Sequence, residues 1–137
     1  MAKAAGADVT VNMSRDGGAL EKFTKDKGTF DLLYECSGAQ VALVGAIAAM
    51  RPRGTILQLG LGGDMTLPMM SITAKELSLK GSFRFHEEFA TGISLMRKGL
   101  IDVKPLITHG VALDDAHSGF ALANDRSKAM KVHIQFS

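Results

Sequence analysis

The chain alternates between short apolar runs and longer segments whose apolar residues recur at helical spacing. Residues 30–35 (FDLLYE) and 55–61 (TILQLGL) are apolar runs that lead into small-residue loops, as buried parallel strands do. Residues 40–50 between them are apolar almost all round, which predicts a helix that packs on a sheet, with Ser37 as its cap. Residues 77–83 form a further predicted strand, which we expect to be the last of the parallel sheet.

The regions on either side of these strands also carry patterns. Residues 8–12 are β-branched and predict a short strand. Residues 14–27 begin with Ser14 and Asp16 and predict a helix, which two adjacent glycines weaken. Residues 87–98 have apolar positions on one face, acids at the start and basic residues at the end, as an amphipathic helix prefers.

The pattern of apolar and polar residues changes after Pro105. Residues 106–113 read as extended, and residues 115–123 predict a helix that Asp114 can cap. Residues 131–136 alternate between apolar and polar side chains, as a half-buried strand does. This tail is therefore interpreted as a different structural unit.

Strands that alternate with helices indicate an α/β fold with a parallel sheet and right-handed crossovers. The two apolar runs read as the later part of a dinucleotide-binding fold, and no G-x-G-x-x-G turn precedes them. Together with the family resemblance given below, this implies a partial Rossmann-type doubly wound sheet without its first two strands and glycine turn. Residues 1–104 are predicted to be a partial dinucleotide-binding domain and residues 105–137 a C-terminal return segment. The first two strands lie mid-sheet in such folds, so the strand at 8–12 should repack, pair with another chain or stay loose.

The amino-acid composition says more about possible binding partners and cellular location than about the fold. The 137 residues are 46% hydrophobic and 22% charged, with a net charge of +2 and basic residues that are scattered rather than clustered. This composition predicts a soluble protein that binds neither nucleic acid nor a membrane. The single cysteine, Cys36, excludes an internal disulfide, and no secretory signal is visible, so we expect a cytoplasmic location.

Ligands of open α/β sheets bind beyond the carboxyl ends of the strands. This rule selects the loops at residues 36–38, 60–63 and 82–86, where small residues let a flat ligand approach the backbone. Cys36 is better explained as a small residue at a strand end than as a nucleophile, because no base is visible beside it. The glycines at 60–63 precede no helix start, which argues against a phosphate loop.

Charged and metal-binding side chains outside these loops give weaker signals. The four histidines are widely spaced, so no metal site is predicted from them. Glu87 and Glu88 point apart as neighbours in a helix, and they are interpreted as helix-start charges. Arg84, a cation just past a buried strand, fits a functional role as well as a structural one.

Several short motifs occur in a fixed order from residue 2 to residue 136. They are Gly6-Ala7-Asp8, Asp31 with Glu35-Cys36-Ser37-Gly38, Gly54 with Leu59-Gly60, and Lys80-Gly81-Ser82-Phe83-Arg84. Together they resemble the second half of the cofactor domain in the medium-chain, zinc-dependent alcohol dehydrogenase superfamily. The stretches GSFRFHEEF (81–89) and LMRKGLIDVKPLITH (95–109) make the resemblance closest to its polyol branch, the sorbitol and L-idonate 5-dehydrogenases.

The resemblance implies a nicotinamide cofactor, NAD or NADP, and in the intact family a catalytic zinc for which this chain offers no ligands. The residues that it places at the cofactor are Cys36, Ser37, Gly38, Leu59, Gly60, Leu61, Ser82 and Arg84. The first loop would border the adenosine and pyrophosphate, the backbone at 59–61 would meet the nicotinamide, and the last two residues would lie near its carboxamide. No catalytic residue is assigned to this chain.

We therefore interpret the chain as part of a dehydrogenase that oxidises a secondary alcohol of a small polyol or sugar acid to a ketone, and expect it to be inactive alone. The alternative is a truncated, non-catalytic relative that acts only through association with other chains. Strand 77–83 would then be the edge at which a homo-oligomer forms. A methyltransferase-like or flavodoxin-like domain is a third hypothesis, which the ordered motifs disfavour.

Overall fold

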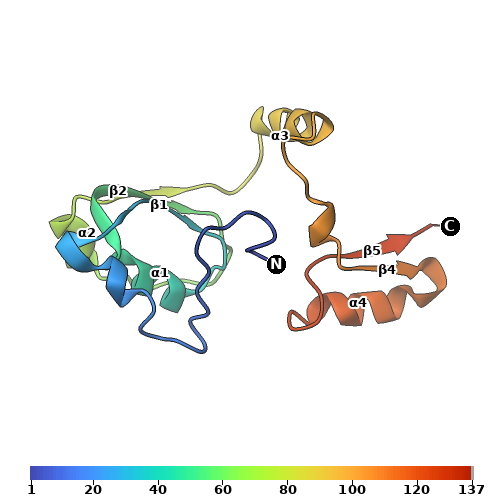
Figure 1. Cartoon of the computed structure of the whole chain (residues 1–137), viewed down its shortest axis with the longest axis horizontal. Helices are drawn as coiled ribbons and strands as arrows, with labels where there is room; N and C mark the ends of the chain where they lie inside the picture. The colour runs from blue at the N-terminus through green and yellow to red at the C-terminus, as the bar shows by residue number, and fades with distance from the viewer. Residues whose placement is uncertain (137) are drawn as a thin grey trace. The chain divides into compact units, whose positions relative to one another are not determined.

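A computed structural model describes residues 1–136, and the chain divides into two compact units (Figure 1). One unit comprises residues 11–84, and the other comprises residues 1–10 together with the residues from 85 onward. Within the described residues, no helix combines the length and the apolar character that a membrane crossing requires.

The unit of residues 11–84 is built on a parallel sheet of three strands in the order β1-β2-β3. Its elements are the short 3-10 turns η1 (Glu21–Phe23) and η2 (Lys25–Lys27), β1 (Phe30–Glu35), α1 (Gln40–Ile47), β2 (Met50–Gln58), α2 (Met69–Ala74) and β3 (Ser78–Gly81). Each helix connects two parallel neighbours, as the α/β pattern predicts.

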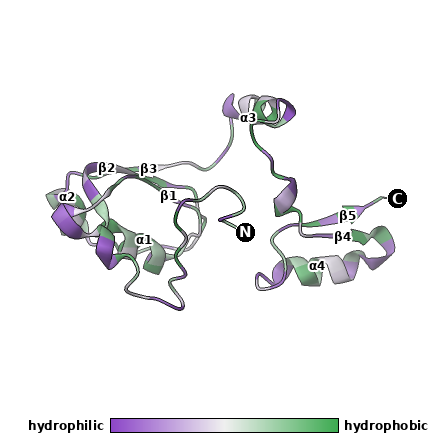
Figure 2. Ribbon diagram, viewed as in Figure 1, coloured by the Kyte–Doolittle hydropathy of each residue, from purple (hydrophilic) through white to green (hydrophobic). Residues whose placement is uncertain are grey.

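The core of this unit lies between the sheet and its helices. Ile56 in the middle strand is fully buried, and it packs with Leu43 and Ile47 of α1 and with Ile72 of α2. Figure 2 shows why α1 can occupy this layer, since most of the helix is coloured as hydrophobic. Only the face of α1 that carries Leu43 and Ile47 is buried, and Val41 on the same helix is 82% exposed, so the apolar run extends beyond the packing surface of the helix.

A bulge interrupts β2 close to its start. Phe30 of β1 pairs with Met50, but Leu32 already pairs with Thr55, so the intervening residues of β2 loop out of the ladder. Within this bulge Arg53 has a positive φ of 64°. Bulges of this kind bend a strand and re-aim its side chains.

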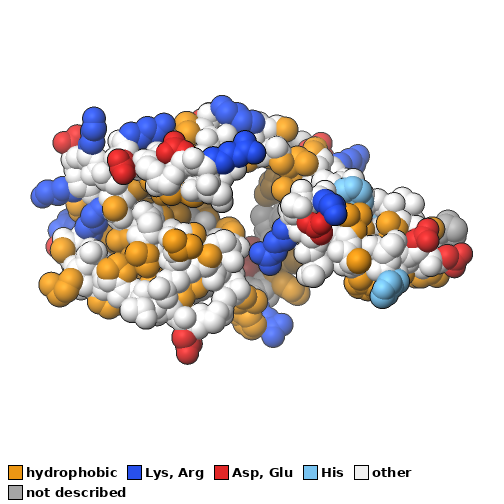
Figure 3. Space-filling view, turned by 90° about the horizontal axis from the view of Figure 1, so that it is seen from below, with side chains coloured by type: hydrophobic (Ala, Val, Ile, Leu, Met, Phe, Trp, Pro, Cys, Tyr) orange, Lys and Arg blue, Asp and Glu red, His pale blue; other side chains and the backbone are white. Residues whose placement is uncertain are grey.

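The second unit contains α3 (Glu88–Arg97), η3 (Lys104–Leu106), β4 (His109–Ala112), η4 (Leu113–Asp115), α4 (Ala116–Asn124) and β5 (Val132–Gln135). Strands β4 and β5 are parallel, and α4 connects them. Gly119 lets α4 lie against β4, because a Cβ at this position would be 2.6 Å from Cγ2 of Val111. Figure 3 shows apolar side chains on the surface of both units, in agreement with the many exposed large hydrophobic residues.

Most predicted elements are confirmed. The strand at 30–35 has the expected bounds, and the structure also contains the strands expected within 77–83 and 131–136 and the helices expected at 87–98 and 115–123. The α/β class with parallel strands is likewise confirmed. The division at residue 104 remains a prediction.

Three predictions near the start of the chain are wrong. Residues 8–12 form no strand, because no neighbouring strand in the described residues offers them a ladder. Residues 14–27 form two 3-10 turns and not an α-helix, which agrees with the helix-breaking effect of the two glycines at 17 and 18. Ser37 is not the N-cap of α1, since Ala39 occupies that position without a side-chain cap.

Two boundaries also differ from prediction in the middle of the chain. Helix α1 ends at Ile47, and β2 begins at Met50 rather than after the Arg-Pro-Arg-Gly segment. The sequence predicts no helix between the strands at 55–61 and 77–83, but this segment contains the six-residue helix α2. Its last turn leads directly into β3.

Candidate functional site

The loops that follow β1 and β2 lie against each other at the carboxyl end of the sheet. The backbone N–H groups of Leu59 and Gly60 both donate to the carbonyl oxygen of Glu35, each at 2.8 Å. A Cβ on Gly60 would lie 2.0 Å from the backbone nitrogen of Gly38, and one on Gly62 would lie 2.0 Å from the carbonyl oxygen of Gly38. These glycines are therefore required by the packing of one loop on the other.

A buried carboxylate holds the two loops together. Glu35 is only 4% exposed. Its Oε1 accepts a hydrogen bond from the backbone of Ser37 at 2.8 Å and a short one from the Ser37 hydroxyl. Its Oε2 accepts from the backbone of Gly38 at 2.9 Å and from Nε2 of Gln58 at 2.7 Å. Burial raises the pKa of Glu35, but these hydrogen bonds outweigh it, so the pKa of this carboxyl is lowered and the charged form is favoured.

Gln58 is the partner of Glu35 on the neighbouring strand, directly opposite in the register of β1 and β2. Its Nε2 donates to Glu35 and also to the carbonyl oxygen of Gly60 at 2.9 Å. Two acceptors face Nε2, which fixes the orientation of the amide. Its Oε1 is buried and has no hydrogen-bond partner within residues 1–136. Gln58 also lines a cavity of about 320 Å³ beside the loop at 60–63.

The third predicted loop is joined to the same place through the backbone. The N–H of Ser82 donates to the carbonyl oxygen of Gln58 at 2.9 Å. Arg84 is exposed and its guanidinium lies 4.6 Å from the centre of the Phe83 ring. Ser82 is thus joined to the end of β2, whereas the interaction found for the Arg84 side chain within residues 1–136 is with its chain neighbour Phe83.

The structure therefore brings together most of the residues that the sequence selects. Cys36, Ser37 and Gly38 follow Glu35, and Leu59, Gly60 and Leu61 follow Gln58. Cys36 is exposed and free. Ser37 contributes differently from its predicted role as the helix cap, since its hydroxyl donates to Glu35 and accepts from the N–H of Ala39 at 3.2 Å.

Sequence reasoning missed the two residues that organise this site. Glu35 and Gln58 are hydrogen-bonding side chains at the ends of otherwise apolar strands, and each precedes a small-residue loop. That position was the available signal, because a polar side chain at a buried strand end requires a partner.

Metal chemistry has no candidate residues in the described part of the chain. Within residues 1–136, no group of three His, Cys, Asp or Glu side chains is arranged to hold a metal ion. Glu87 and Glu88 lie at the start of α3, as expected, and Glu88 accepts a hydrogen bond from the backbone of His86 at 3.0 Å. Backbone hydrogen bonds lower the pKa of Glu88.

Parallel strands with coupled loops at their carboxyl ends define a class, the α/β proteins of the dinucleotide-binding type. Within this class, residues 1–98 match the family described as zinc-binding dehydrogenase, and the chain belongs to that family. The resemblance noted in the sequence is thereby confirmed.

Individual relatives are of the polyol type. The chain is 36% identical to L-idonate 5-dehydrogenase (NAD(P)(+)) of Escherichia coli K12 over 99% of its own length and 39% of that protein. It is 34% identical to sorbitol dehydrogenase of Arabidopsis thaliana, over 96% of its length and 38% of the relative. The chain thus spans about two fifths of the length of these relatives.

Solved structures agree with these similarities. The crystal structure of the Escherichia coli L-idonate 5-dehydrogenase superposes with a TM-score of 0.90 at 37% identity, over 98% of this chain and 38% of that one. A protein described as a short chain alcohol dehydrogenase from Escherichia coli CFT073, in complex with NADH, superposes with a TM-score of 0.85 at 27% identity, over 98% of this chain and 40% of that one.

Proposed function

We propose that this chain forms one side of the nicotinamide-cofactor site of a polyol-type dehydrogenase. The observation that carries the proposal is the junction of the β1 and β2 loops, held by Glu35 and Gln58 at the carboxyl edge of a parallel sheet. Similarity to an L-idonate 5-dehydrogenase named for NAD(P)+ and to a protein complexed with NADH supports the same cofactor class.

The residues of this edge fit one side of such a cofactor. Gln58 lines a cavity of about 320 Å³ beside the loop at 60–63, and its buried Oε1 has no donor within the described residues. A buried acceptor without a partner is costly, so a ligand whose N–H group reached this oxygen would gain a hydrogen bond. NAD and NADP share the nicotinamide carboxamide, which carries such a group.

Specific roles follow for the eight predicted residues. The loop at 36–38 would border the adenosine side, and the backbone at 59–61 would contact the nicotinamide. Ser82 and Arg84 would line the rim near the carboxamide. A bound nicotinamide supplies the hydride acceptor, while the residues of this chain bind and orient it and restrict the access of water.

The whole protein, in this proposal, oxidises a secondary alcohol of a small polyol or sugar acid to a ketone. The names of the relatives, idonate and sorbitol dehydrogenases, support this substrate class. The family name implies zinc, but the described residues provide no ligand set, so we assign no step through a metal to this chain. The cytoplasmic location remains a prediction.

Titration of the purified chain with NADH, followed by nicotinamide fluorescence, tests the cofactor proposal. We expect saturable binding, and a parallel titration with NADPH shows which of the two cofactors is preferred. The test variant is Gln58→Leu, which removes the buried acceptor Oε1 and the Nε2 donor to Glu35. This variant should bind NADH more weakly than the unchanged chain. Absence of binding to a chain with native circular dichroism would refute the proposal.

Association through β3 is a second candidate role. The strand is at an edge of the three-stranded sheet, all of its residues are exposed, and Leu79 is 45% exposed. An edge strand presents unpaired backbone groups that a two-fold related copy can use. We propose that a homo-oligomer would form there.

A further inference from the structure

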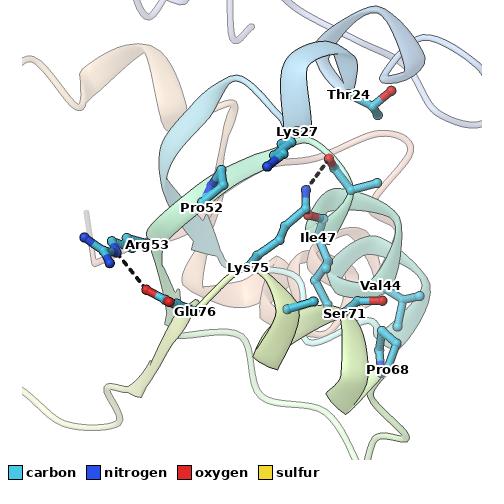
Figure 4. A pocket seen from close by; sticks show the side chains of 12 residues that line it. Thr24, Lys27, Val44, Ile47, Pro52, Arg53, Pro68, Ser71, Lys75 and Glu76 are labelled. Atoms are coloured by element: carbon cyan, nitrogen blue, oxygen red, sulfur yellow. Dashed lines mark hydrogen bonds and ion pairs between the residues drawn. The ribbon is translucent and has the colours of Figure 1, made fainter.

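A larger cavity lies at the opposite end of the sheet from the candidate cofactor site. Its volume is about 830 Å³, and it is bounded by η2, the bulge of β2 and the C-terminal parts of α1 and α2 (Figure 4). This volume is within the range of sites that take small organic molecules. Nothing in the proposed dehydrogenase function uses it.

The left-handed backbone conformations of the described residues are concentrated around this cavity. Only four non-glycine residues in the described chain have a positive φ, and three of them, Lys27, Arg53 and Glu76, line the cavity. The fourth, Asp26, is adjacent to Lys27. Such conformations cost free energy and concentrate at functional sites. The bulge of β2 is also held in place here, since the N–H of Arg53 donates to the carbonyl oxygen of Lys75 at 2.7 Å.

Positively charged side chains outnumber negatively charged ones in the lining of the cavity. Lys75 donates to the carbonyl oxygens of Ala48 and Met50, both at 2.7 Å, so its charge is used where α1 ends and β2 begins. Arg53 pairs with Glu76 through Nε at 2.7 Å, as Figure 4 shows. Lys27 has neither a hydrogen bond nor an ion pair from its side chain among the described residues. Three cations and one carboxylate therefore line the cavity, which gives an excess of positive charge.

The remaining wall is largely apolar. Val44, Ile47, Pro52, Pro68 and Ala74 line the cavity beside the hydroxyl of Ser71. A ligand that complements this arrangement has an anionic head for Lys27 and Arg53 and an aliphatic body for the apolar wall. We propose that this cavity binds a small organic carboxylate with an aliphatic chain.

Octanoate is a suitable probe for this site. In methyl NMR spectra of the full chain, octanoate should shift the signals of Val44 and Ile47 saturably. Octan-1-ol and octylammonium, which have the same chain length, should bind at least several-fold more weakly, because they lack the negative head. Higher ionic strength should also weaken octanoate binding.

A pair of charge-matched variants tests the role of Lys27. Lys27→Glu should weaken octanoate binding roughly fivefold, the factor expected for loss of one favourable ion pair. Lys80→Glu changes the net charge equally at an exposed position outside the cavity and should leave binding unchanged. Lys27→Gln provides a neutral second variant with the same expected direction.

Three results would overturn the proposal. One is no shift of the Val44 and Ile47 methyl signals in a chain with a well-dispersed spectrum. Another is equal affinity for octanoate and octan-1-ol, which would indicate a merely apolar surface. The third is equal weakening by Lys27→Glu and Lys80→Glu, which would indicate net charge alone.

Discussion

Gly60 offers a direct test of the loop packing at the candidate cofactor site. In Gly60→Ala the added Cβ would lie 2.0 Å from the nitrogen of Gly38, 2.5 Å from Oε2 of Glu35 and 2.8 Å from the carbonyl carbon of Cys36. Two of these three atoms belong to the backbone, so the clash cannot be relieved by rotation of a flexible side chain. The matched control is Gly63→Ala in the same loop, where no atom lies within 4 Å of the new Cβ.

The expected difference between the two variants can be estimated. Overpacking of this kind costs about 1–3 kcal/mol, and we expect the upper part of that range because the contacts involve the backbone. Gly63→Ala should change the free energy of unfolding by about 0.4–1 kcal/mol in the stabilising direction, through the reduced entropy of the unfolded chain. In a unit of this size, about 1 kcal/mol corresponds to roughly 4–8 °C in Tm.

Urea unfolding followed by tyrosine fluorescence measures this difference, because Tyr34 is the only tyrosine of the chain and belongs to the unit of residues 11–84. Far-UV circular dichroism of the two variants in the absence of urea shows whether both retain the fold. If Gly60→Ala and Gly63→Ala have the same free energy of unfolding, the loops are not packed as described, and the close approach of Gly60 to Gly38 is refuted.

Three further predictions concern other parts of the unit. The pKa of Glu35 is lowered on folding, so its stabilising effect should be complete well above pH 4.5 and be lost as the pH falls through the lowered pKa; in urea unfolding between pH 2 and 6, Glu35→Gln should lack this dependence. Lys75→Met should lower the free energy of unfolding by about 1–3 kcal/mol, because carbonyl oxygens where α1 ends and β2 begins lose their donor; equal stability would contradict this role of Lys75. Leu79→Lys should convert a dimer to a monomer in sedimentation, and an unchanged mass would exclude the β3 interface.

Local pattern predicted β1, β3 and β5 and the helices α1, α3 and α4, but it also predicted a strand at 8–12 and a helix at 14–27 that do not form. The run 30–35 is short and largely apolar, which is why its type and bounds could be predicted without knowledge of its neighbours. Its predicted burial is wrong, since only Glu35 of this strand is buried and Leu32 is 45% exposed. Helix α2 was missed because it has only six residues, too few to display a helical period. The bulge at Arg53 was missed because it depends on pairing with β1, and pairing is not visible in one strand alone.

The sequence predicted that the selected loops lie together, but it did not predict how they are joined. The rule for the carboxyl ends of strands depends only on topology, and the loops after β1 and β2 do lie against each other, whereas their role in cofactor binding stays a prediction. The contact between Glu35 and Gln58 joins residues that are 23 positions apart, and only the register of β1 and β2 brings them together. For the same reason the glycines were explained by ligand approach, whereas the structure shows that Gly38 and Gly60 are needed for contact between the loops.

The construction of the site also restricts which part of a dinucleotide it can hold. The backbone N–H groups of Ser37 and Gly38 would suit a phosphate, but both already donate to the carboxylate of Glu35. A phosphate placed there would compete with the Glu35 carboxylate for the same two N–H donors and would be repelled by its negative charge. We therefore expect the loop at 36–38 to contact the cofactor without binding its phosphates. Inorganic pyrophosphate should therefore leave the amide NMR signals of Ser37 and Gly38 unchanged in the folded chain at neutral pH. A saturable shift of both signals would mean that Glu35 releases these donors to a ligand, and the loop would then be a phosphate-binding element after all.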